Sequence, residues 1–231
     1  MTMRPDSTRI MRRKIAHILR SSDWEEQWEA VMAEHPAQKL ISPLFSALFS
    51  IREEEHWHAV TCMGHVVDEL ADEHLESARV VMRRLMWSLN DESGGIGWGA
   101  PEAMGEIMAR NQGLAQEYCR ILISFILPRS GPDNFLEYTP LRVGAYWGIA
   151  RMAQVRPQLV QPISWDQTLD QEQDPQILLL ICLALDHPGD LSPALQSRLR
   201  SLTLRSDQVR LYWDKRFQTF SLSTQAHNLL A

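Results

Sequence analysis

Apolar residues recur with the spacing of α-helices along almost the whole chain, and short turn signals separate one predicted helix from the next. The clearest pattern covers residues 53–71, where Trp57, Val60 and Val67 fall on one side of a helix that turns about 100° per residue. A second helix with similar apolar spacing follows over residues 75–89. We expect the first helix to bury its apolar side and to expose a polar side to solvent. That polar side comprises Glu54, Glu55, His58, Thr61, Cys62, His65, Asp68, Glu69 and Asp72.

Four later helices are predicted to begin at a proline that follows a small or capping residue. Proline suits the first turn of a helix because its missing N–H would have no partner there, and Ser, Thr or Asp before it can cap the helix. The first three of these prolines recur at intervals of about 40 residues, close to the length of HEAT and armadillo repeats. The four pairs are Ala100-Pro101, Thr139-Pro140, Asp174-Pro175 and Ser192-Pro193.

This spacing predicts an all-α fold, a right-handed α-α superhelix (a HEAT/armadillo-like solenoid) of about five helix pairs in one domain over residues 1–231. An irregular helical bundle in which the spacing is coincidental is the alternative. Residues 1–21 would form an N-terminal cap helix, residues 22–203 the helix pairs, and residues 204–231 a C-terminal cap. The pairs are expected at about 22–51, 53–91, 99–128, 138–165 and 174–203.

The C-terminal segment has a different pattern. Val209, Leu211 and Trp213 alternate with polar residues, and a second apolar stretch, 217–222, follows a short polar turn. Alternation with a period of two is typical of β-strands, so we expect a small β-hairpin or an extended tail that covers the last helices.

Composition narrows the classes of function. The chain has 231 residues and a formal net charge of −6, so it lacks the overall positive field that holds nucleic acid or an anionic membrane. Its three cysteines predict neither a disulfide framework nor a zinc finger. The N-terminus lacks the apolar core of a secretory signal, and the apolar runs are too short to span a bilayer, so a cytoplasmic location and no membrane contact are expected.

The most distinctive segment is Arg83–Ile107, RRLMWSLNDESGGIGWGAPEAMGEI. It resembles an uncharacterised family of HEAT-repeat proteins found mainly in sulfate-reducing and related anaerobic bacteria. The resemblance is sharp over these residues and looser over 24–51 and the later helix pairs. It implies a HEAT-like fold and a bacterial cytoplasmic protein, and it carries no activity over to this chain.

Physically, this segment is a glycine-rich joint between two predicted helix pairs, with two tryptophans and several charges around it. The absence of a Walker lysine and the two acids before the glycines argue against a phosphate site. One interpretation is a structural corner whose tryptophans pack against neighbouring helices. The other is a binding surface for a partner, comprising Arg84, Trp87, Asn90, Asp91, Glu92, Trp98 and Glu102.

The polar side of the 53–71 helix contains residue types that bind metals. His58, Cys62, His65 and Glu69 share one stripe, and each carries a donor atom that metals accept. The stripe spans about 16 Å, so at most two of these side chains could reach one ion. We therefore expect no metal site and no cofactor. If a metal did bind here, His58 and His65 would be its candidate ligands.

No catalytic motif is identifiable, so a non-enzymatic binding scaffold is the favoured function, with a protein or peptide in the solenoid groove and at the joint as partner. The alternative is a nucleic-acid-binding protein related in fold to the HEAT-like DNA-alkylation-repair glycosylases. The acidic composition argues against nucleic acid, and a small-molecule ligand stays open. The alternative would use arginines expected on the second helices of successive pairs: Arg79, Arg83, Arg84, Arg120, Arg142, Arg151 and Arg156.

Overall fold

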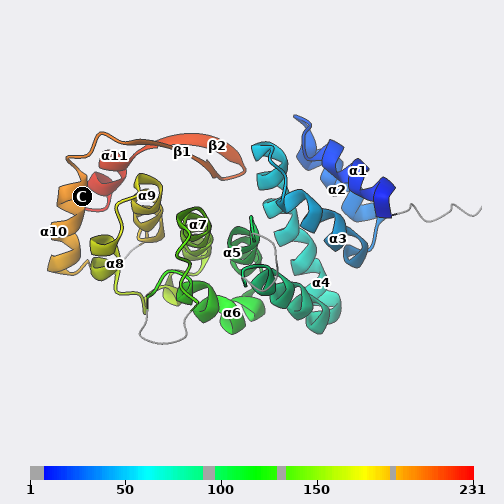
Figure 1. The fold of residues 1–231 in the computed structure, drawn as a ribbon, viewed down its shortest axis with the longest axis horizontal. Coiled ribbons are helices and arrows are strands. Elements are labelled where there is room, and N and C mark those ends of the chain that lie inside the picture. The colour runs from blue at the N-terminus through cyan, green and yellow to red at the C-terminus, as the bar shows by residue number, and fades with distance from the viewer. Residues whose placement is uncertain (1–7, 91–96, 129–133, 188–190) are drawn as a thin grey trace, which may run out of the picture. The chain divides into compact units, whose positions relative to one another are not determined.

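The computed structural model describes residues 8–90, 97–128, 134–187 and 191–231 (Figure 1). In these ranges the chain forms eleven α-helices, a short 3-10 helix and one two-stranded antiparallel sheet, which confirms the predominantly helical fold with a small C-terminal hairpin. The chain divides into two compact units, Met1–Asn111 and Gln112–Ala231. The expectation of a single domain stays a prediction, and each unit is considered by itself.

Unit 1 contains five helices: α1 (Thr8–Ile18), α2 (Trp24–Glu34), α3 (Ala37–Leu48), α4 (Glu53–Ser88) and α5 (Ala100–Arg110). α3 packs on α1 and α4, and α4 in turn packs on α5. The predicted break between residues 71 and 75 is present, because His74 has non-helical dihedral angles (φ −149°, ψ 83°) inside α4.

The two halves of α4 fold back on each other at His74. A straight helix of 36 residues would be about 54 Å long. Instead, a Cβ atom on Gly97 would lie 2.6 Å from the Ser88 carbonyl oxygen, and one on Gly99 would lie 2.9 Å from the His56 ring. Gly97 and Gly99 are at most about 7 Å apart, so the two ends of α4 lie close together. We call this feature the His74 reversal.

Part of the polar side of the first half of α4 is buried, which corrects the expectation that all of it faces solvent, although Glu54 and Asp72 are exposed. Glu55, His58, Thr61 and Cys62 are each less than one tenth exposed. The expectation was wrong because α2, α3 and α5 all pack around α4. Charge and hydrogen bonding are satisfied internally: Arg20 Nε–H donates to Glu55 Oε2 at 2.7 Å.

A glycine allows α4 and α5 to approach closely. A Cβ atom on Gly64 would lie 2.6 Å from Cγ of Glu106 and 3.0 Å from Cδ of Arg110. Arg110 Nε–H donates to the buried Glu106 carboxylate at 2.8 Å, so this ion pair passes over the space that a side chain at position 64 would occupy. Any larger residue would have to displace the pair.

Unit 2 comprises the remaining elements. The expected start of α7 is shifted by one residue, because Tyr138 is its N-cap, whereas Asp174 and Ser192 cap α9 and α10 with their side chains as predicted. The expected pair at 138–165 is also corrected, because its second helix starts only at Trp165. The elements are α6 (Gln112–Ser124), α7 (Thr139–Val155), η2 (Pro157–Leu159), α8 (Trp165–Gln171), α9 (Pro175–Ala184), α10 (Pro193–Leu202), β1 (Gln208–Trp213), β2 (Arg216–Ser221) and α11 (Leu222–Asn228).

The C-terminal hairpin packs on the helices of unit 2. β1 contacts α9, and β2 contacts α11. Figure 1 shows the hairpin edge-on. The Trp147 indole N–H on α7 donates to the Tyr212 carbonyl oxygen at 2.7 Å. Asp214 and Lys215 form the two-residue turn with positive φ angles of 50° and 62°, the backbone that tight hairpin turns require.

Replacing Gly64 with alanine is expected to destabilise the protein by about 1–3 kcal/mol, because the added methyl group overlaps the Glu106–Arg110 pair. Urea denaturation followed by circular dichroism measures this change. Gly113, which is exposed in α6, is the matched control, and its alanine variant should be neutral or slightly more stable. A Gly64→Ala variant as stable as the wild type would contradict the close approach.

Candidate functional site

The described part of the joint between α4 and α5, residues 97–99, lies at one end of unit 1. Gly97 lies against the end of α4 at Ser88, and Gly99 (φ +75°) lies against the end of α3 at Leu48. A positive φ favours glycine because other residues have a Cβ that clashes there. The short segment 97–99 therefore brings together the ends of α3, α4 and α5.

Four large apolar side chains are exposed at this end of unit 1. Trp87 is 66% exposed in the last turn of α4, and Trp98 is 38% exposed in the joint. Phe49 ends α3 and is 47% exposed, and Ile51, in the turn before α4, is fully exposed. They gather at one end because Phe49 adjoins Leu48, Trp87 adjoins Ser88, and Trp98 lies between the glycines that contact both. We call these four residues the aromatic edge.

The exposure of Trp87 corrects the interpretation in which both tryptophans pack against neighbouring helices. The helix turn that carries Trp87 faces away from the interface that buries Leu85. Arg84 is exposed on the same helix, and its guanidinium lies 3.8 Å from the centroid of the Phe45 ring, a cation–π contact. Asn90 is exposed just beyond the helix end.

The predicted surface also includes three acidic residues. Asp91 and Glu92 lie outside the described residues. Glu102 is buried in the first turn of α5, with 8% of its surface exposed. The structure therefore brings Arg84, Trp87, Asn90 and Trp98 to the surface near the joint and places Glu102 beneath it.

Glu102 is an unusual buried acid. Its Oε2 atom accepts no hydrogen bond within the part of the chain that the structure describes. Burial raises the pKa of the carboxyl from 4.5 to about 7, and the backbone N–H of Glu102 offsets only part of this effect. Near neutral pH this side chain changes between a neutral acid and a buried, uncompensated anion.

The two metal candidates on α4 do not form a site together. His58 is stacked on Trp24 with ring centroids 4.2 Å apart, and its Nδ1–H donates to the Leu19 carbonyl oxygen at 2.7 Å. His65 lies seven residues further along, about 10 Å of helix rise, which is too far for one ion. Among the described residues no three His, Cys, Asp or Glu side chains converge on a common point.

The arginines of the proposed nucleic-acid groove have internal partners in several cases. Arg79 and Arg83 both pair with Glu76, at 3.4 and 2.6 Å. Arg142 and Arg151 lie on α7, the first helix of its pair, which corrects their expected place on a second helix.

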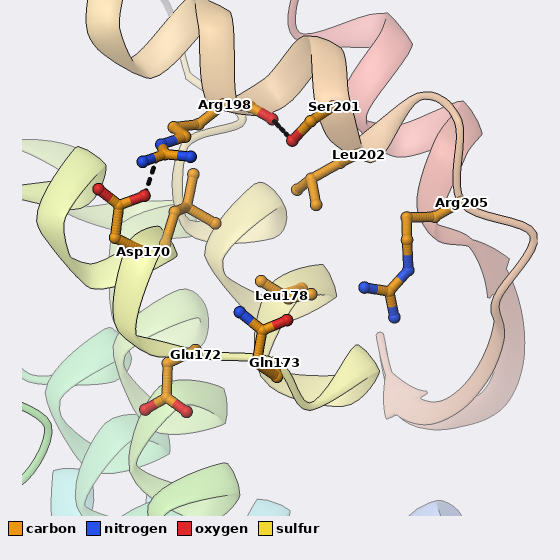
Figure 2. A pocket seen from close by; sticks show the side chains of 9 residues that line it. Asp170, Glu172, Gln173, Leu178, Arg198, Ser201, Leu202 and Arg205 are labelled. Carbon is orange, nitrogen blue, oxygen red and sulfur yellow. Dashed lines mark hydrogen bonds and ion pairs between the residues drawn. The ribbon is translucent and has the colours of Figure 1, made fainter.

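A cavity in unit 2 was not anticipated from the sequence. It has a volume of about 500 Å³ and lies among α8, α9, α10 and the segments that adjoin them (Figure 2). Leu169, Leu178 and Leu202 supply apolar surface. Polar side chains surround this surface: Asp170, Glu172, Gln173, Arg198, Ser201 and Arg205.

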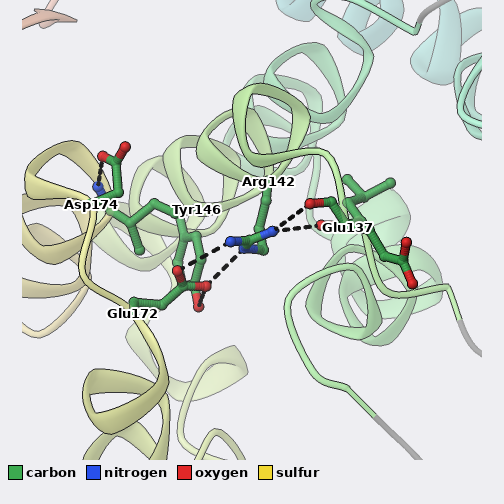
Figure 3. A network of polar contacts seen from close by, with 7 residues as sticks. Glu137, Arg142, Tyr146, Glu172 and Asp174 are labelled. Atoms are coloured by element: carbon green, nitrogen blue, oxygen red, sulfur yellow. Dashed lines mark hydrogen bonds and ion pairs between the residues drawn. The ribbon is translucent and has the colours of Figure 1, made fainter.

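A buried ion pair holds Glu172, which is one of the residues that line this cavity (Figure 3). Arg142 on α7 donates from Nε to Glu172 Oε1 at 2.8 Å, and the Tyr146 hydroxyl donates to the same oxygen at 3.2 Å. Burial, followed by the neighbouring carboxylate, raises the pKa of Tyr146, so its hydroxyl remains a donor. No spacing in the sequence links residues 142 and 172, because the contact depends on how α7 meets the turn before α9.

Replacing Arg142 with methionine is expected to destabilise the protein by about 3–5 kcal/mol, because it leaves the buried Glu172 carboxylate without its cation. Thermal and urea denaturation measure the loss. The exposed pair Arg83–Glu76 gives the control, since Arg83→Met should change stability by less than about 1 kcal/mol. Equal effects of the two variants would contradict the structural role of the buried pair.

Because of Glu102, we expect the stability of the folded protein to depend on pH. Because its folded-state pKa of about 7 exceeds the ordinary 4.5, the folded protein holds the proton more tightly than the unfolded chain. Its contribution therefore falls as pH rises from 4.5 to about 7, by about 3 kcal/mol in all.

The Glu102→Gln variant should lose this pH dependence, so its stability relative to the wild type should increase between about pH 5 and pH 8. Urea denaturation across this range gives the difference, and Glu29→Gln, at an exposed position on α2, is the control. Parallel pH profiles of Glu102→Gln and the wild type would show that the acid is not held in its neutral form.

Comparison with known proteins adds no family to this picture. No protein-family model matches the chain, and no curated protein matches it either. Within the described residues, no helix is both long enough and apolar enough to cross a bilayer.

Proposed function

We propose that this protein is a non-enzymatic binding scaffold whose helix pairs stack as a HEAT/armadillo-like α-solenoid and whose partner is a protein or peptide. Two facts support the stacking within the units. In unit 1, α3, α4 and α5 pack in chain order, and the His74 reversal makes α4 itself a helix pair. In unit 2, α7 packs on α9, the next long helix along the chain. Neighbour-to-neighbour packing is what a solenoid requires.

The observation that carries the proposal is the exposure of Trp87. Tryptophan has a large apolar side chain, and its exposure to water without a partner is energetically unfavourable. Here three further exposed apolar residues, Phe49, Ile51 and Trp98, lie at the same end of unit 1. Exposed apolar surface gathered in this way is typical of sites for partner proteins.

The surroundings of the aromatic edge suit a peptide partner. Aromatic residues and arginine are the side chains that most often dominate binding energy at protein interfaces. Arg84 is held over the Phe45 ring, so part of its conformational freedom is already lost before a partner arrives. Asn90 adds an exposed amide beside the tryptophan. An apolar side chain of the partner would pack on Trp87, with polar contacts to Arg84 and Asn90 around it.

Replacing Trp87 with alanine is expected to weaken partner binding by about 2–4 kcal/mol, as at the centre of other interfaces. The stability of the protein should change by no more than about 0.5 kcal/mol, because the side chain is mostly exposed. Affinity purification from a lysate of the source organism, with quantitative mass spectrometry, identifies the partner. Titration of the purified partner then gives the two dissociation constants.

Leu204→Ala is the matched control, because Leu204 is an exposed apolar residue of unit 2. Proteins retained by the wild type and by Leu204→Ala, and lost with Trp87→Ala, support the proposal. Recovery of the same proteins with all three, or of none above an empty resin, would rule it out.

A further inference from the structure

The arginines that line the cavity of unit 2 have N–H donors that make no hydrogen bond with the described residues. Arg198 uses Nε for Asp170 Oδ1, at 2.5 Å, and Arg205 uses Nε for Asp207 Oδ2, at 2.6 Å. Their terminal NH₂ groups make no further hydrogen bond with the described residues. Gln173 likewise makes none within those ranges. Because a guanidinium offers five N–H donors, both arginines keep most of their donors available.

The acceptors of the same cavity are largely occupied. Both oxygens of Glu172 accept hydrogen bonds from Arg142, and Oε1 also accepts from Tyr146. Asp170 is held by Arg198. The cavity therefore offers more available donors than acceptors, which suits a ligand that brings hydrogen-bond acceptors. A negatively charged acceptor makes the strongest hydrogen bonds with guanidinium groups.

Figure 2 shows how these groups are arranged. The Arg205 side chain extends toward Gln173 and Leu178, while Arg198 lies with Asp170 on the other side of the space. Leu169, Leu178 and Leu202 provide the apolar surface between the polar walls. A volume of about 500 Å³ lies within the range of small-molecule sites, which run from about 300 to 1,000 Å³.

We propose that this cavity binds a small carboxylic acid with an apolar body. The carboxylate accepts hydrogen bonds from Arg205 and Gln173, and the apolar body lies on the three leucines. A planar carboxylate matches the two parallel N–H donors of a guanidinium. The fixed charges around the cavity balance: Arg142, Arg198 and Arg205 face Asp170, Glu172 and Asp207. Recognition therefore rests on directed hydrogen bonds rather than on a positive field. The site is independent of the aromatic edge.

Cinnamate and its neutral amide, cinnamamide, are the probes. They have the same apolar body and differ only in the group that faces Arg205 and Gln173, which is a carboxylate in cinnamate and a neutral amide in cinnamamide. In isothermal titration calorimetry on the full chain, cinnamate is expected to bind with a dissociation constant of about 1 mM or below, and cinnamamide at least about tenfold more weakly. Equal affinity for the two compounds, or no heat with cinnamate, would overturn the proposal.

Variants locate the binding. Arg205→Met should weaken cinnamate about tenfold and leave cinnamamide unchanged, and Arg205→Lys, which keeps the charge but loses the paired donors, should fall between. Gln173→Ala removes a donor without breaking an ion pair, so it remains informative if Arg205→Met unfolds. Arg200→Met is the control, because Arg200 is exposed on α10 but does not line the cavity. An effect of Arg200→Met as large as that of Arg205→Met, or wild-type affinity in both the Arg205 and Gln173 variants, would refute the assignment.

Discussion

The reversal of α4 at His74 is the constraint on which unit 1 depends. With φ at −149° and ψ at 83°, one residue interrupts the helix, so that its two halves can lie side by side. If the helix continued straight, Ser88 would lie nearly 50 Å from His56, and no segment as short as 97–99 could contact both. The short path through the two glycines and the presence of Trp87 and Phe49 at the same end of unit 1 both follow from this reversal.

Ion pairs serve as packing elements in both units. Arg110 and Glu106 cross over Gly64, Arg20 reaches the buried Glu55, and Arg142 holds Glu172 against Tyr146. Breaking such a pair leaves a buried charge, which is more costly than never having buried it. Glu102 is the exception, since burial raises its pKa to about 7 and no ion pair with a described residue opposes this rise. The charged residues thus stabilise the folded units, and their number says little about the charge of a partner.

The sequence predicts much of the local structure and little of what the helices pack against. Proline at the helix starts and alternation at Val209, Leu211 and Trp213 are local signals, and the structure contains both the helices and the hairpin. Amphipathic spacing predicts that the polar stripe containing His58 faces solvent. It cannot show that other helices cover both sides of this helix. The Trp87 surface was among the candidates, but its exposure depends on the His74 reversal. No pattern in the sequence predicts the cavity of unit 2, because its residues meet only after α8, α9 and α10 have packed.

The hydrogen bond from Trp147 to Tyr212 has a consequence for synthesis of the chain. The acceptor Tyr212 lies 65 residues after the donor Trp147, so the ribosome makes it much later. Until it has been added, α7 presents an apolar face and an unsatisfied indole N–H, while the hairpin that will cover them does not yet exist. Incomplete chains with exposed apolar surface are prone to aggregate. During translation, unit 2 therefore keeps this apolar face uncovered until the hairpin has been made.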